Sequence, residues 1–399
     1  MYKYILTILS IIEIMKIGIL SLPLKSNYGG LLQSFALQKV LKNLGYDNVE
    51  SIKYTRPPKL ITLPLRILNR IKFKIKTKGA AKIFPKDNSA VICANTQRFI
   101  SENISQSQPY TTKTPAKDFK KYDAYIVGSD QIWRFSYFKL DIPFAYLNFV
   151  KDPNALKIAY ASSFGVEKWQ YPKFLETKCS KLAKRFDAIS VREDIGVDFC
   201  KKFLGVEAFH VLDPTMLLET QNYIDIINSD LSRGFIKQIE SDNILFSYIL
   251  DESSDKTNFI TKCANILGLK VHSIMPQPDM GGNKIEQCIF PPVSAWLQGF
   301  QKSKFVITDS FHGIVFSIIF NKSFIAIANK KRGIARFYSI LKLFKLESRL
   351  IFSTTGSISK ADLLAPINWN IVNAEIANKK KFSLNFLNKA LSKKNNLTL

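Results

Sequence analysis

The sequence predicts an α/β protein with two Rossmann-like domains, and three observations support this prediction. Short apolar runs alternate with longer segments of helical periodicity, which is the pattern of βαβ units in parallel sheets. This cycle starts at Met15 and starts again after Asp213 and Pro214. The chain has 399 residues, which exceeds the size at which a single hydrophobic core keeps growing.

The first domain is expected to span residues 15–212. The apolar run at 16–22 predicts the first buried strand, and residues 29–45 predict a helix that Gly45 closes. Four more short apolar runs predict strands at 124–130, 157–163, 188–191 and 210–213.

The second domain is expected to span residues 213–365. Its apolar runs predict strands at 243–250, 270–275, 305–310 and 323–328. Segments of helical periodicity lie between these strands, at 255–267, 293–303 and 312–320. Residues 366–399 are lysine-rich and predict a helical, basic tail.

The first 14 residues do not fit this cycle. Their apolar run, Ile5 to Ile14, is too short to span a membrane and has no small-residue cleavage site. Because Met15 stands directly before the first strand, we expect residues 1–14 to be an extension or to lie upstream of the native start.

The five cysteines are scattered, with no Cys-x-x-Cys pair and no cluster at metal-ligand spacing. We therefore expect reduced packing residues in a cytoplasmic protein, with neither a structural zinc site nor a disulfide framework. The five are Cys93, Cys179, Cys200, Cys263 and Cys288.

The chain is strongly basic, with 57 lysines and arginines against 32 acids and a formal charge of +25. Such a field favours polyanions, anionic membranes or phosphorylated small molecules, although compositional bias alone could produce it. The sequence has no zinc-finger spacing, no aromatic RNA-binding pattern and no recognisable recognition helix. Nucleic acid is therefore not an expected partner.

Residues 53–86 contain eleven lysines or arginines and no acid, interleaved with isoleucine, leucine and phenylalanine. A basic amphipathic stretch suits an anionic membrane surface, which would place the protein at the inner face of the membrane. The alternative is a solvated insertion that packs on the first domain.

Small polar residues follow several predicted strands. In open α/β sheets, ligands bind at the carboxyl ends of the strands, where helix amino termini attract anions. The sequence has no G-x-G-x-x-G after the first strand and no P-loop motif anywhere. A phosphate would therefore be held by arginine, lysine, histidine and helix ends.

His312 is one of only three histidines, and it stands between a predicted strand and a predicted helix. An ordinary histidine has a pKa of about 6.5, so it can give or accept a proton near neutrality. The alternative is a histidine that only caps or packs the helix. His210 and His272 are expected to be structural.

Six motifs together resemble the polysaccharide pyruvyl transferase family, and they occur in the family's order over residues 15–350. They are NYGGLLQSFALQKVL, YIVGSDQIW, YASSFG, SVRED, VLDPTMLL and FVITDSFHGIVFSIIFNKSFIAI. The resemblance implies two Rossmann-like domains that face each other across a cleft, as in GT-B enzymes. It also implies phosphoenolpyruvate as donor, a cell-surface glycan as acceptor, a pyruvate ketal as product, and no metal or organic cofactor.

The resemblance supports catalytic roles for His312 and Arg192, and the position of Asp130 at a strand end makes it a third catalytic candidate. Arg192 matches the family's arginine after this strand, and its planar fork suits the carboxylate or phosphate of the donor. An ion pair with Glu193 or Asp194 is the alternative. Asp130 could orient or deprotonate an acceptor hydroxyl, but it could equally cap a helix.

Some family members carry an arginine two residues before the motif histidine, where this chain has Ser310. We expect cationic side chains that follow the next predicted strand, 323–328, to replace this arginine, unless those residues form a solvated loop. The donor set is then Arg192, Ser310, His312, Gly313, Lys330, Lys331, Arg332 and Arg336. The expected acceptor set is Asn27, Tyr28, Gln33, Ser129, Asp130, Ser162 and Ser163. Asp309 is a weaker candidate acid.

Two other functions remain open from sequence. A GT-B glycosyltransferase that uses a nucleotide sugar would share the fold, but its usual paired-glutamate pattern in the second domain is not evident. A non-enzymatic membrane scaffold would rest on residues 53–86 alone.

Overall fold

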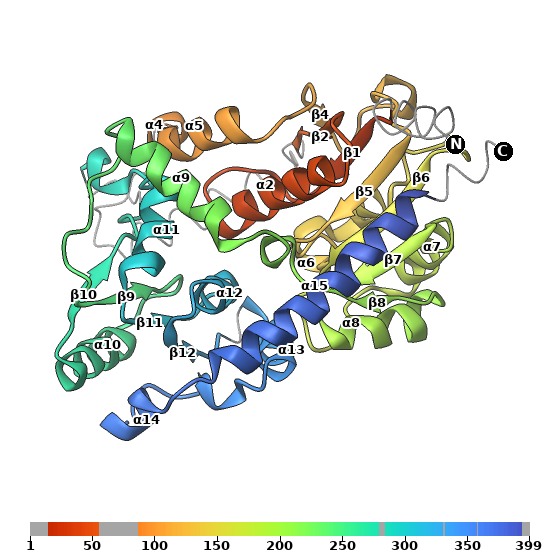
Figure 1. The fold of residues 1–399 in the computed structure, drawn as a ribbon. Helices are drawn as coiled ribbons and strands as arrows, with labels where there is room; N and C mark the ends of the chain where they lie inside the picture. Colours follow the sequence, from red (N-terminus) through yellow and green to blue (C-terminus); the bar gives the residue numbers. More distant parts are fainter. Residues whose placement is uncertain (1–14, 56–86, 279–283, 330–331, 357, 393–399) are drawn as a thin grey trace, which may run out of the picture.

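The computed structural model describes residues 15–55, 87–278, 284–329, 332–356 and 358–392, and its two large sheets are parallel (Figure 1). The predicted class, α/β with two Rossmann-like domains, is confirmed. Residues 1–14, most of the basic segment 53–86, and Lys330 and Lys331 lie outside the described residues.

The first sheet has six parallel strands in the order β2-β1-β5-β6-β7-β8. They are β1 (Ile17–Leu20), β2 (Val49–Ser51), β5 (Ala124–Gly128), β6 (Leu156–Ser162), β7 (Ala188–Val191) and β8 (Phe209–His210). The central strands are buried along their whole length, which explains why they read as continuous apolar runs rather than as alternating ones.

Helices and a small two-stranded sheet accompany these strands. The helices are α2 (Tyr28–Asn43), α4 (Ser89–Ile92), α5 (Ala94–Asn103), α6 (Phe135–Phe138), α7 (Lys173–Ala183) and α8 (Asp194–Phe199). Helix α2 ends as predicted, because Gly45 adopts a φ of 93° and its amide donates to the Lys42 carbonyl. A two-stranded parallel sheet of β3 (Tyr54–Thr55) and β4 (Tyr110–Thr111) was not predicted.

The second sheet has five parallel strands in the order β10-β9-β11-β12-β13. They are β9 (Ile244–Tyr248), β10 (Lys270–Ser273), β11 (Phe305–Thr308), β12 (Ser323–Ile327) and β13 (Leu350–Ile351). The associated helices are α9 (Thr220–Ser232), α10 (Ser254–Leu267), α11 (Val293–Lys302), α12 (Phe311–Ile319), α13 (Ala335–Leu343) and α14 (Lys360–Leu364).

The two halves share one continuous apolar core. Buried residues of α2 in the first half belong to the same hydrophobic cluster as buried residues of α11 and α12 in the second. At their junction the rings of Tyr28 and Trp296 stack with centroids 5.7 Å apart, and the Tyr28 hydroxyl donates to the Pro291 carbonyl at 2.8 Å. This packing fixes the amino terminus of α2 against the second half.

A long final helix, α15 (Trp369–Ser392), also joins the halves, because it runs from the second half back along the first (Figure 1). Its Phe386 ring lies 6.3 Å from that of Tyr160, and the Ser383 hydroxyl accepts a hydrogen bond from the Leu212 amide. None of the helices in the described part of the chain is long and apolar enough to cross a membrane.

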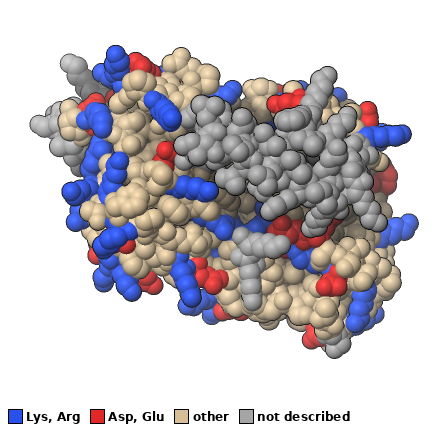
Figure 2. All heavy atoms as spheres, turned by 180° about the vertical axis from the view of Figure 1, so that it is seen from behind, with Lys and Arg blue, Asp and Glu red and all other residues tan. Residues whose placement is uncertain are grey.

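Basic and acidic side chains are intermixed on one face of the molecule (Figure 2). On the face drawn in Figure 2, lysine and arginine side chains are scattered around much of the outline, with acidic side chains between them. All five cysteine side chains are buried.

Candidate functional site

A cavity of about 380 Å³ lies between the two halves, at the carboxyl ends of strands from both sheets. The first half contributes Asn27, Tyr28 and Asp130 to its lining, and the second half contributes Ser310 and His312 among others. A larger groove of about 610 Å³ lies between α7 and α15, but none of the predicted site residues lines it. The smaller cavity is therefore the candidate site.

His312 lies in the first turn of α12, directly after β11, where the strand and helix pattern predicted it. Its side chain is almost buried, but the residue lines the cavity. One edge of the ring, at Nδ1, lies against Gly29 in the first turn of α2. The other edge, at Nε2, lies 3.7 Å from the Oδ2 atom of Asp213.

Arg192 follows β7 and lies behind the cavity, with 4% of its surface exposed. Its Nη1 donates to Oδ2 of Asp213 at 2.8 Å, and its Nη2 lies 4.0 Å from Oδ1 of Asp130. The ion pair left open with Glu193 or Asp194 is thus made with Asp213 instead. Among the described residues, Nε and Nη2 of Arg192 have no hydrogen-bond partner.

Asp213 is the residue of this site that sequence reasoning missed. Its fully buried carboxylate accepts hydrogen bonds from Gln33 and Arg192 on Oδ2, and from the amide and hydroxyl of Thr215 on Oδ1. Burial raises the pKa of Asp213, but the interactions with His312 and Arg192 outweigh burial and hold that pKa below its ordinary value. The sequence did contain a signal for Asp213, because this acid stands at the end of a predicted strand, directly before Pro214.

Arg336, on α13, places a second cation beside Arg192. Both guanidinium groups lie over the ring of Phe311, at 4.4 Å for Arg192 and 5.4 Å for Arg336. Burial, and then the charge of Arg192, lower the pKa of Arg336 to about 10. Within the described chain its Nε atom has no hydrogen-bond partner. Two adjacent buried cations with unpaired donors form a site suited to an anion.

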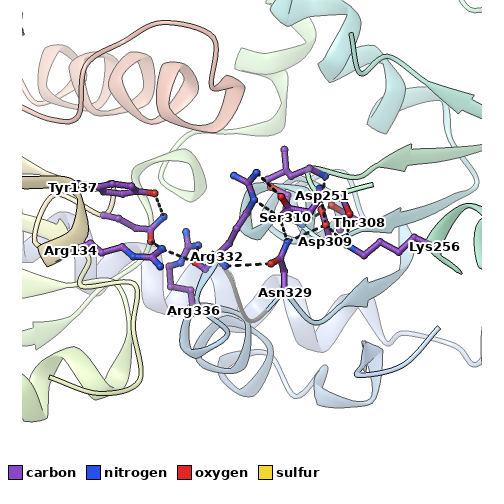
Figure 3. Close-up of polar contacts among 12 residues, drawn as sticks. Arg134, Tyr137, Asp251, Lys256, Thr308, Asp309, Ser310, Asn329, Arg332 and Arg336 are labelled. Atoms are coloured by element: carbon purple, nitrogen blue, oxygen red, sulfur yellow. Dashed lines mark hydrogen bonds and ion pairs between the residues drawn. The ribbon is translucent and has the colours of Figure 1, made fainter. Parts of the chain in front are cut away.

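Arg332 has a different environment from Arg336, although the two are four residues apart. Its Nε donates to Asp251 at 2.7 Å, and this hydrogen bond is the main reason that the pKa of Asp251 falls to about 2. Figure 3 shows Arg332 between the two halves, where its carbonyl also accepts a hydrogen bond from Arg134 of the first half. Arg332 lines the cavity, but its guanidinium is already paired with a carboxylate.

Asp309 is also committed to internal contacts. It accepts hydrogen bonds from Lys256, Asn329 and the Leu250 amide, and its side chain is fully buried (Figure 3). These contacts fix the end of β12 against the ends of β9 and β11.

The predicted acceptor residues fall into two groups. Asn27, Tyr28 and Asp130 line the cavity. Gln33, Ser129, Ser162 and Ser163 are buried behind it. The hydroxyls of the last two donate to the Val127 carbonyl and to Glu193, respectively.

Asp130 lines the cavity whereas Gly313 and His210 do not, and all three have contacts inside the protein. Asp130 accepts a hydrogen bond from the amide of its neighbour Gln131 at 2.7 Å, and it caps no helix, because the next helix, α6, begins at Phe135. Gly313 permits close packing, because a Cβ there would lie 2.0 Å from Oγ1 of Thr308. The ring of His210 contacts the Arg192 carbonyl at 3.0 Å, and burial lowers the pKa of His210.

Sequence reasoning also missed Gly29 and Glu193. Glu193 is fully buried and accepts hydrogen bonds from Ser163 and the Gly165 amide on one oxygen, while its other oxygen has no partner among the described residues. No group of three or more His, Cys, Asp or Glu side chains in the described segments is arranged to hold a metal ion.

Comparison with known proteins identifies the family of the chain. The model of the polysaccharide pyruvyl transferase family matches residues 27–331, which include most of the cavity lining, whereas Arg332 and Arg336 lie just beyond the matched range. The chain belongs to this family, as the sequence motifs predicted. No curated protein matches it.

Solved structures resemble the chain only distantly. An uncharacterised protein of Klebsiella pneumoniae is 16% identical, with a TM-score of 0.38 over 71% of this chain and 98% of that one. The N-terminal domain of Candida albicans trehalose-6-phosphate phosphatase is 10% identical, with a TM-score of 0.42 over 94% and 96%. The wall teichoic acid polymerase TagF is 10% identical, with a TM-score of 0.42 over 96% and 91%. Nothing about function follows from likenesses at this level.

Proposed function

We propose that the protein transfers pyruvate from phosphoenolpyruvate to two hydroxyls of one sugar in a cell-surface glycan and releases phosphate. Besides family membership, one observation carries the proposal. Arg192 and Arg336 are buried side by side next to His312, and within the described chain each has at least one N–H group without a hydrogen-bond partner. Arg336 and His312 line the cavity, and Arg192 lies directly behind it.

The donor carries a phosphate and a carboxylate, so it needs cations with directed hydrogen-bond donors. Arginine forks match both groups, and they bind more strongly where water is excluded. The amino terminus of α12 adds free amide groups at the same place. We therefore assign the donor to the region of Arg192, Ser310, His312 and Arg336.

The reaction requires a proton donor to carbon and a base for the attacking hydroxyl. Protonation of the methylene carbon makes C2 electrophilic, a sugar hydroxyl then attacks C2, phosphate leaves, and the second hydroxyl closes the ketal ring. One hydroxyl proton balances the proton given to carbon, and the other leaves with phosphate. His312 is suited to the proton transfer at carbon, and Asp130 to the acceptor hydroxyl. No metal or organic cofactor takes part in this scheme.

The acceptor would enter from the side of the first half. Tyr28 and Asn27 lie in the cavity wall there, and aromatic faces beside amide and carboxylate groups suit a sugar ring. We propose a cytoplasmic enzyme, with contact to an anionic membrane through residues 53–86 where the glycan is lipid-linked.

Donor binding tests this proposal before any acceptor is known. Calorimetric titration should show that phosphoenolpyruvate binds and that nucleotide sugars do not, and mixing with glycan intermediates from cells should release phosphate. His312→Ala should slow release by at least about 10²-fold, the scale of a positioned acid or base, without weakening donor binding to the same degree. Binding of nucleotide sugars but not of phosphoenolpyruvate would refute the proposal.

A further inference from the structure

Groups from three separate elements contact the carboxylate of Asp213. Its Oδ2 atom accepts hydrogen bonds from Gln33 of α2 and from Arg192 at the end of β7, and it faces His312 of α12. The first two residues belong to the first half and the third to the second half. One buried oxygen therefore connects the predicted donor-binding arginine with the predicted proton-transfer histidine.

Asp213 is itself held rigidly. Its other oxygen accepts from the Thr215 amide at 3.1 Å and from the Thr215 hydroxyl at 2.7 Å. The neighbouring Leu212 carbonyl accepts a hydrogen bond from the Tyr160 hydroxyl, and the Leu212 amide donates to Ser383. A carboxylate fixed at both oxygens can impose geometry on its partners.

The arrangement has a different consequence for each partner. In Arg192 it occupies one terminal nitrogen, so Nε and Nη2 have no hydrogen-bond partner within the described chain, although Nη2 lies 4.0 Å from Oδ1 of Asp130. In His312 it places an acceptor opposite Nε2, so the neutral ring keeps its proton on that nitrogen, while Nδ1, packed against Gly29, carries none. The Nε2 to Oδ2 distance of 3.7 Å is longer than a hydrogen bond, and contacts of this kind are often loose without substrate.

The other charged groups around His312 do not offer this contact. Arg336 lies across the ring of Phe311, and the ion pair that Asp130 makes is with Arg192, at 4.0 Å. Asp309, three residues earlier, is bound to Lys256. Asp213 is thus the carboxylate that faces Nε2 among the described residues.

We infer that Asp213 is a positioning residue that orients the free N–H groups of Arg192 toward the donor and keeps the proton of neutral His312 on Nε2. The inference deepens the proposed function and rests on it for the roles of the two partners. The contacts themselves do not depend on which donor is used.

The ring nitrogens of His312 give a direct test. With three histidines in the chain, ¹⁵N signals of the labelled rings can be assigned by single substitutions. Wild-type His312, when neutral, should show the Nε2–H form, and Asp213→Asn should move a measurable share to Nδ1–H. Thr215→Val is the matched control: it removes a hydrogen bond to the same carboxylate but keeps its charge, so the ring should remain as in wild type.

Kinetics add a second readout. Asp213→Asn should both raise the KM for phosphoenolpyruvate and lower kcat, on the order of 10²-fold together in kcat/KM, because it disturbs both partners. Thr215→Val should change kcat/KM by less than about threefold. Equal losses in the two variants would mean that Asp213 supports only the local fold.

The outcomes separate the two proposals. If wild-type protein does not use phosphoenolpyruvate but Asp213→Asn still shifts the His312 ring signals, the positioning role stands and the proposed function fails. An unchanged ring in Asp213→Asn overturns the role. If Asp213→Asn does not fold, the ¹⁵N signals of His312 in the wild-type protein still test the role. A neutral Nδ1–H form in the wild type would overturn the positioning role of Asp213.

Discussion

The ring of His312 occupies the space that a side chain at position 29 would need. A Cβ built on Gly29 would lie 2.0 Å from Nδ1 of His312, far closer than any real contact. The histidine belongs to the second half and the glycine to the first turn of α2, so this contact brings the two halves together at the site. It explains why a glycine stands at an early helix position, where other residues are better helix formers.

Gly29→Ala should therefore displace His312 and lower transfer by at least about 10²-fold, as expected when a reacting group is misplaced by an ångström. Gly30→Ala is the matched control, because a Cβ there would meet its nearest neighbour at an ordinary 3.4 Å. Steady-state phosphate release compares the two variants. Comparable activity in both would show that the ring position is not critical.

Arg192→Lys should raise the KM for phosphoenolpyruvate with a smaller effect on kcat. Lysine keeps the positive charge but loses the fork that can contact Asp213 and an anion at the same time. Lys184→Arg, in the groove away from the cavity, is a suitable control for lysine and arginine exchange. An unchanged KM for phosphoenolpyruvate in Arg192→Lys would show that Arg192 only forms a structural ion pair.

Arg336→Met should separate stability from donor binding. The lowered pKa of Arg336 shows that its charged form is disfavoured in the fold, by burial first and by Arg192 second. The apolar variant should thus have a higher Tm than wild type in the absence of ligand. Phosphoenolpyruvate should raise the Tm of wild type, because it binds the native state, but raise that of the variant much less.

Thermal unfolding with and without donor checks this prediction. An equal donor-induced rise in both proteins would place the anion away from Arg336. A lower Tm for the free variant would show that the hydrogen bond from Arg336 to the Arg332 carbonyl outweighs the cost of burying the charge.

The basic segment 53–86, which lies mostly outside the described residues, predicts binding to anionic vesicles that weakens with salt. Replacement of Lys72, Lys74, Lys76 and Lys78 by Gln should release the protein, since each cation near the surface contributes about 1 kcal/mol. Activity on a soluble acceptor should persist. Wild-type protein that never sediments with such vesicles, or a variant without soluble activity, would contradict a membrane role.

The fold could be predicted from sequence because the central strands of both large sheets are buried along their whole length and helices such as α2 and α10 are long. Local rules also placed the end of α2 at Gly45 and His312 at the start of α12. These features depend on residues close together in the chain, where periodicity and turn chemistry are informative.

The site was less predictable because its contacts join distant segments. The pair of Arg192 and Asp213 joins two strand ends, and the contact of Gly29 with His312 joins two halves. Arg332 and Arg336 looked equivalent in one basic stretch, yet one is paired with Asp251 and the other is buried with a free Nε. Tertiary packing alone distinguishes them.

Polar residues at strand ends were also misleading in part. Ser162 is the last residue of β6 and Ser163 follows it, but a bulge with Ala161 at a φ of 49° directly precedes Ser162, and both hydroxyls are bonded inside the protein. A shift of one residue in the strand register therefore decides whether such a side chain faces a cavity.

In the proposed reaction, pyruvate leaves phosphoenolpyruvate and becomes a ketal on a sugar. A labelling experiment tests this directly: phosphoenolpyruvate with ¹³C at C2 is supplied together with glycan intermediates, and the label is followed by NMR and mass spectrometry. We expect a labelled ketal carbon bonded to two oxygens of one sugar, with one phosphate released for each ketal formed. Phosphate release without label in the glycan, or sugar transfer from a nucleotide donor with phosphoenolpyruvate unused, would contradict it.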